Sequence, residues 1–173
     1  DMAEAVRYFS EKGLSIDGPH YLSRKRSDGS VLEWQLLYIG NEEGELELPY
    51  IIKWNDSDEK RRQDLVKREV IVPDSCVFSH LSITVRDLEP IVEKWSRLFN
   101  LKVGEIFIDE ELQAKCQTLK LPGGNLVFCS PIGSGIVSEF LKNRGEKPFQ
   151  VNLSCGQKNE TFKMLGGFYK LGQ

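Results

Sequence analysis

The stretch from residue 78 to residue 99 constrains the fold more than any other part of the chain, because a strand pattern runs directly into a helix pattern. Polar and apolar side chains alternate over residues 77–85, so that His80, Ser82 and Thr84 share one face of the predicted strand. Asp87 then suits a helix N-cap. Apolar residues follow at the spacing of a single helical stripe: Leu88, Ile91, Val92, Trp95, Leu98 and Phe99. We expect a strand with one polar face and an amphipathic helix on its apolar face.

A second copy of the helix pattern opens the chain. Asp1 takes the place of Asp87, and the stripe repeats at matching positions with Met2, Ala5, Val6 and Phe9. Gly13 suits the position just after the helix. The matching strand does not precede this copy, so we expect the given chain to begin inside a module. The alternative is a chance likeness, because amphipathic helices are common.

The remaining strand patterns complete two modules. Residues 21–26 and 31–39 flank an Asp28-Gly29 turn and predict a hairpin, and residues 48–54 predict a third strand. Strands are also expected at 103–108, 114–121, 126–129 and 148–153, with a strand or hairpin in 161–171. The fold class is therefore α+β, with tandem βαβββ modules, the first lacking its initial strand. The expected organisation is module one at 1–55, a charged linker at 56–75, and module two with a C-terminal strand extension at 76–173.

Composition excludes some functions. A net charge of −3 over 173 residues offers no electrostatic argument for binding nucleic acid or an anionic membrane. No apolar run reaches membrane-spanning length. The four cysteines form no C-x-x-C pair, so we expect reduced, structural thiols in a cytoplasmic protein.

The segment from His80 to Leu88, HLSITVRDL, resembles the opening strand of the vicinal oxygen chelate superfamily, which includes glyoxalases, epimerases and ring-cleaving dioxygenases. Residues 23–54, with the Asp28-Gly29 turn and the LPYIIKW strand, are similar to the glyoxalase-like domain of uncharacterised bacterial proteins. The resemblance implies a curved mixed sheet that forms a cup, with helices on its outer face. It also implies a divalent metal inside the cup on His, Glu and Gln ligands, where it stabilises an enediolate-like anion.

His80 matches the histidine of the superfamily's first strand and is the one plausible metal ligand. Residues 126–129 lack the usual glutamate of a module's last strand, so no metal site is assigned and the cofactor is unknown. His80 has the alternative of a hydrogen-bonded pocket or structural histidine, and Glu33 that of an exposed strand carboxylate. The candidate pocket residues are His80, Ser82, Glu33, Gln35, Lys53, Gln150 and Asn152.

Three hypotheses follow. The first is a glyoxalase-like protein that binds a small organic molecule in a sheet-lined cup, without a complete metal site in this chain. The second is a divalent-metal-dependent lyase, isomerase or dioxygenase whose other ligands lie in a missing N-terminal segment. The third is a structural protein of paired modules, with a homodimer as an open alternative. The sequence leaves open whether the protein is an enzyme.

Overall fold

The computed structural model describes residues 1–40, 46–70, 76–156 and 159–172. The chain divides into two compact units, Asp1–Pro73 and Asp74–Gln173. Among the described residues, no helix combines the length and the apolar character that crossing a membrane requires.

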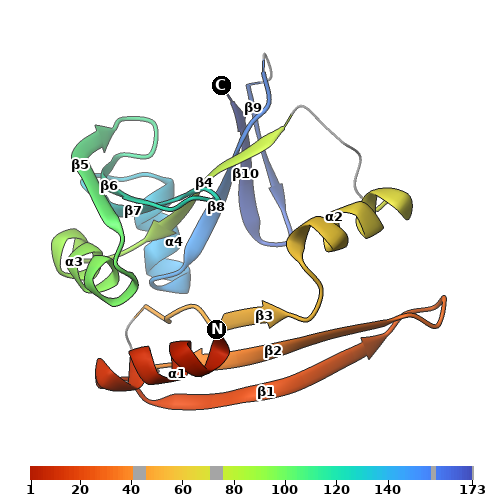
Figure 1. Ribbon diagram of the computed structural model, residues 1–173. Coiled ribbons are helices and arrows are strands. Elements are labelled where there is room, and N and C mark those ends of the chain that lie inside the picture. The colour runs from red at the N-terminus through yellow and green to blue at the C-terminus, as the bar shows by residue number, and fades with distance from the viewer. Residues whose placement is uncertain (41–45, 71–75, 157–158, 173) are drawn as a thin grey trace. The chain divides into compact units, whose positions relative to one another are not determined.

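Unit 1 is a helix on a three-stranded antiparallel sheet, followed by a second helix (Figure 1). Its elements are α1 (Met2–Glu11), β1 (Ile16–Lys25), β2 (Val31–Ile39), β3 (Ile51–Trp54) and α2 (Asp58–Lys67). The predicted first helix is confirmed: Asp1 accepts a capping hydrogen bond from the Ala3 amide at 3.2 Å, and Gly13 follows the helix with φ +79°. The hairpin is confirmed too, with Gly29 at φ +86° in its turn.

Helix α2 lies in the segment predicted as a charged linker, and ion pairs connect it to the β1–β2 hairpin. Arg26 Nη1 lies 2.6 Å from Asp64 Oδ2, and Arg68 pairs with both Asp64 and Asp28. Hydrogen bonds from Arg68 and Arg26 hold the pKa of the Asp64 carboxyl below its ordinary value. The Arg61 guanidinium lies 3.9 Å above the Trp54 ring. These basic side chains therefore bind within their own unit.

Unit 2 contains a seven-stranded mixed sheet in the order β5-β6-β7-β4-β8-β10-β9 (Figure 1). Its elements are β4 (Val77–Thr84), α3 (Leu88–Phe99), β5 (Lys102–Asp109), β6 (Ala114–Lys120), β7 (Asn125–Pro131), α4 (Ile136–Arg144), β8 (Pro148–Ser154), β9 (Glu160–Met164) and β10 (Gly167–Gly172). The first five form a complete βαβββ module in which β4 pairs in parallel with β7. On its other side β4 pairs antiparallel with β8. The α+β prediction is confirmed, although only the second of the two sheets is mixed.

The stripe of α3 is buried as predicted. Leu88, Val92, Trp95 and Leu98 are each at most 5% exposed. Trp95 meets Phe128 of β7 edge to face, with ring centroids 5.2 Å apart. Asp87 occupies the predicted N-cap position, but its side chain makes no capping hydrogen bond. Packing against the sheet, rather than the cap, is therefore what holds α3 in place.

The expectation of four reduced cysteines is wrong, because Cys76 and Cys155 form a disulfide. The bond joins the residue before β4 to the residue after β8, two strands that are neighbours in the sheet. The pairing depends on strand order, which residue spacing does not reveal. Cys116 and Cys129 are buried thiols on facing strands. Hydrogen bonding with Cys116 and burial raise the pKa of the Cys129 thiol, so it stays protonated and unreactive.

Candidate functional site

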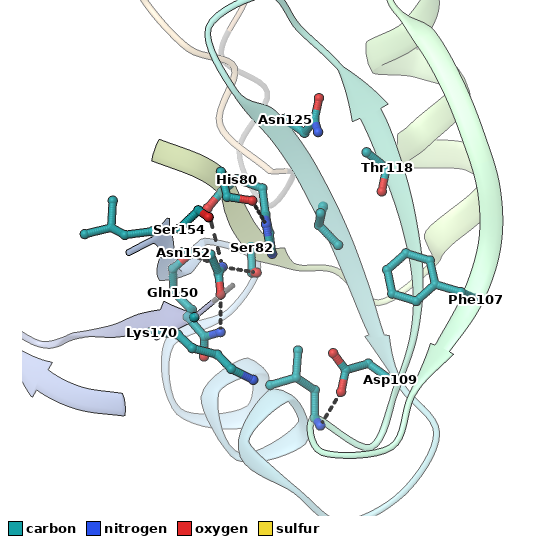
Figure 2. Close-up of a pocket in the computed structure, with 15 residues that line it drawn as sticks. His80, Ser82, Phe107, Asp109, Thr118, Asn125, Gln150, Asn152, Ser154 and Lys170 are labelled. Atoms are coloured by element: carbon teal, nitrogen blue, oxygen red, sulfur yellow. Dashed lines mark hydrogen bonds between the residues drawn. The ribbon is translucent and has the colours of Figure 1, made fainter. Parts of the chain in front are cut away.

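A cavity of about 300 Å³ opens on the polar face of β4, on the side of the sheet away from α3 (Figure 2). His80 and Ser82, two of the candidate residues, contribute to its lining from β4. Gln150 and Asn152 join them from β8, because His80 lies opposite Asn152 and Ser82 opposite Gln150 in the register of the two strands. Four candidate residues from segments about 70 positions apart are thus brought together.

The base of this cavity is a chain of buried polar side chains, visible in Figure 2. Gln150 Nε2 donates to Asn152 Oδ1 at 2.8 Å, and Asn152 Nδ2 donates to Ser82 Oγ at 3.0 Å. Ser82 is 1% exposed, Gln150 4% and Asn152 6%. A buried amide without a partner would cost about 1–3 kcal/mol, so these mutual hydrogen bonds are what makes the burial tolerable. They also restrict each side chain to one orientation.

His80 stands beside this polar chain. Its Nδ1 lies 3.0 Å from Ser79 Oγ, which orients the ring and leaves Nε2 as the nitrogen that can meet a ligand. Burial lowers the pKa of the His80 imidazole, and the nearby positive charge of Lys170 lowers it further, against a smaller opposite effect of Asp109. The ring is therefore neutral near pH 7. A neutral imidazole in this position can donate or accept one hydrogen bond through Nε2.

The lowered pKa of His80 predicts a loss of stability in mild acid. The unfolded chain takes up a proton near pH 6.5, whereas the folded chain takes it up only at lower pH. This contribution is fully present above pH 6.5 and declines as the pH falls below it. We expect the free energy of unfolding to fall between pH 7.5 and 5.5, measured by urea denaturation. His80→Gln should reduce that slope, and an unchanged slope in the variant would contradict the assignment.

The opposite wall carries residues that the sequence analysis did not select. Phe107 and Asp109 come from β5, and Thr118 comes from β6. Lys170 of β10 lines the cavity from the β8 side. Asp109 Oδ1 accepts a hydrogen bond from the Leu112 amide at 2.9 Å, and Lys170 Nζ lies 2.5 Å from Glu111 Oε2. Strand alternation in the C-terminal tail was the available signal for Lys170, but it could not show which strand the tail would join.

Glu33, Gln35 and Lys53 belong to unit 1 and do not line this cavity. They lie on the face of the unit 1 sheet that also carries Leu37, which is fully buried. Gln35 and Lys53 line a depression together with Met2 and other residues of α1, so this is the helix-bearing face. Glu33 is itself exposed, which agrees with its alternative as an exposed strand carboxylate. Its Oε2 accepts a hydrogen bond from Asn55 Nδ2 at 3.3 Å.

The residues around His80 do not fit a divalent metal ion. Within the described part of the chain, no three His, Cys, Asp or Glu side chains cluster so as to hold one. Asn152 Oδ1 in the polar chain already accepts a hydrogen bond from Gln150. A divalent ion requires several oxygen or imidazole ligands. We therefore derive no chemistry through a metal.

Comparison with known proteins agrees with this fold. The model of a glyoxalase-like domain family matches residues 1–103. A hypothetical protein from Staphylococcus aureus is similar in structure, with a TM-score of 0.73 and 18% identity over 99% of this chain and 62% of that protein. Methylmalonyl-CoA epimerase from Mycobacterium tuberculosis has a TM-score of 0.51 and 14% identity over 61% of this chain and 93% of its own. No protein of curated function matches significantly.

Both solved structures are less than 25% identical to this chain, so the two likenesses support the fold alone. The chain spans 62% of the Staphylococcus aureus protein, which is therefore considerably longer than the part that is matched.

Proposed function

Because this chain belongs to the glyoxalase-like domain family, we propose that it binds a small organic molecule in the sheet-lined cup of unit 2, without a complete metal site of its own. The observation that carries the proposal is the hydrogen-bonded chain Ser82–Asn152–Gln150, buried at the base of a cavity that also presents the His80 ring. A volume of about 300 Å³ suits a small ligand.

A purely structural role would not require this arrangement. Buried amides that bond only to each other contribute little net stability, and apolar side chains of the same shape would serve a core equally well. Away from the cavity the same face of the sheet becomes an apolar core, in which Cys116 and Cys129 are fully buried together with Val137 of α4. The polar chain on β4 and β8 therefore lies where this apolar core borders the cavity, and Leu112 and Val127 belong to both. We infer that the polar residues are placed for a ligand.

The similarity to methylmalonyl-CoA epimerase does not extend the proposal to coenzyme A esters, because it is a likeness of fold. The described residues do not add to His80 the other His, Cys, Asp or Glu side chains that a metal site would need. We therefore propose binding rather than metal-dependent lyase, isomerase or dioxygenase chemistry for this chain. A cytoplasmic location is part of the proposal.

The proposal predicts that small molecules bind to the chain and that filling the cavity removes this binding. A chemically diverse fragment library would be screened by saturation-transfer-difference NMR. Thr118→Trp places a large ring in the cavity and should abolish the signals of cavity ligands. Lys120→Trp changes an exposed residue at the end of the same strand and should leave them unchanged.

Amide spectra of both variants would establish that they are folded. The proposal is wrong if no fragment binds, or if the fragments that bind do so equally well to folded Thr118→Trp.

A further inference from the structure

Two opposite charges face each other across the cavity of unit 2. Lys170 approaches from β10 and Asp109 from β5, and the ends of both side chains point into the same space (Figure 2). Among the described residues, no ion pair joins the two. Both charges act on His80, since Lys170 lowers the pKa of its ring and Asp109 raises it. Lys170 and Asp109 therefore do not neutralise each other through a salt bridge.

Each charge keeps capacity for a ligand. Asp109 uses Oδ1 to accept the Leu112 amide, and Oδ2 is the oxygen that remains. Lys170 donates one of its three ammonium hydrogens to Glu111, whose side chain is 67% exposed compared with 28% for Lys170. Ion pairs with such an exposed partner are weak, so a ligand can compete with Glu111 or bind beside it.

The amide side chains at the base of the cavity have fewer hydrogen-bonding groups left for a ligand. Asn152 is occupied on both its oxygen and its nitrogen, and Gln150 has already committed its nitrogen. The charged groups that the described lining presents to the cavity are therefore Lys170 and Asp109, and the uncharged hydrogen-bonding groups beside them include His80 Nε2, the Thr118 hydroxyl and the Gln150 oxygen.

We propose that this cavity binds a small zwitterion of amino-acid size, with its carboxylate at Lys170 and its ammonium group at Asp109. The inference deepens the proposed function and rests on it. A simple carboxylic acid would pair with Lys170 but would leave the Asp109 carboxylate facing it across a confined space. A simple amine would meet the Lys170 charge in the same way. A ligand that carries both groups pairs with Lys170 and with Asp109. Its carboxylate can also accept a hydrogen bond from His80 when Nε2 carries the proton.

The test compares probes that differ only in charge. The twenty L-amino acids are screened by saturation-transfer-difference NMR, and the best binder is then measured by calorimetry beside its N-acetyl and its C-terminal amide derivatives. Each derivative lacks one charge and should bind about 10- to 100-fold more weakly, as expected for a lost hydrogen bond to a charged group.

Two substitutions separate the two ends of the ligand. Asp109→Asn should weaken the amino acid but not its N-acetyl derivative, which has no ammonium group. Lys170→Met should weaken the amino acid and the N-acetyl derivative alike. The matched controls are Glu105→Gln and Lys102→Met, which change exposed charges on β5 outside the cavity lining and should alter neither affinity.

The outcomes distinguish this inference from the proposed function. Equal affinity of the amino acid and both derivatives would overturn the zwitterion, as would binding of uncharged fragments in the cavity with no amino acid bound. In either case, loss of binding in Thr118→Trp would still support a small-molecule site. If no probe or fragment of any class binds in the cavity, both proposals fail. Amide spectra and thermal unfolding of each variant would show that it is folded.

Discussion

Phe128→Ala should lower the free energy of unfolding by about 3–5 kcal/mol, the largest stability effect that we expect from a single substitution in this chain. Phe128 of β7 is 0% exposed and packs edge to face on Trp95 of α3. Its removal leaves a cavity where the sheet meets the helix, and strand pairing on both sides of β7 limits how far the structure can collapse into it. Urea denaturation followed by far-UV circular dichroism and tryptophan fluorescence would measure the loss.

Phe162→Ala provides the matched control. Phe162 lies on the edge strand β9, is 38% exposed and stacks on Tyr169 with ring centroids 5.5 Å apart. Its removal exposes little new apolar surface and leaves no enclosed cavity, so we expect a change of about 1 kcal/mol or less. Equal losses in the two variants would show that the α3–β7 contact is not the centre of this core.

Removal of the disulfide is the second large effect. The double variant Cys76→Ser with Cys155→Ser should lower the free energy of unfolding by about 2–4 kcal/mol, because the bond closes a segment of 79 residues and restricts the unfolded chain. Dithiothreitol should destabilise the oxidised wild-type protein by a similar amount. It should have no effect on the double variant, which serves as the control.

The disulfide also bears on the candidate site. The Cys155 amide donates to the Gly172 carbonyl at 2.8 Å, and Ser154 and Gly172 both line the cavity. We therefore expect probes of the cavity to bind more weakly to the reduced protein. A wild-type protein that is equally stable with and without dithiothreitol would contradict the pairing of Cys76 with Cys155.

The local elements of both units could be predicted from the sequence. The alternation at His80, Ser82 and Thr84 indicated a polar strand face, and that face does line the cavity. The stripe containing Trp95 identified α3 and its buried side, and the Asp28-Gly29 turn identified the hairpin. Each of these inferences depends on the repeat of a helix or a strand, or on the conformational freedom of glycine in a turn.

Only some of the residues of the site could be predicted from these local patterns. Gln150 and Asn152 were selected because their strand resembled residues 48–54, but the same comparison selected Lys53, which lies in the other unit on the helix-bearing face. Asp109 and Lys170 were missed because nothing near them in sequence connects them with His80. They reach it through strand pairings that run from β5 to β10 across the sheet.

By itself, then, the sequence determined most of the secondary structure, the α+β class and the polarity of the β4 face, because side chains repeat every two residues along a strand and about every 3.6 along a helix. Helix α2 was missed because its residues are almost all polar and show no apolar stripe. The tertiary structure decided which strands flank β4, and with them the disulfide, the buried polar chain and the two opposed charges. Those features depend on residues that are far apart in the sequence, such as Cys76 and Cys155 with a separation of 79. Their pairing comes from burial of the whole sheet rather than from any local preference. The strand and helix at residues 78–99 lie at the centre of unit 2, and the other strands of the sheet supply the remaining residues of the cavity.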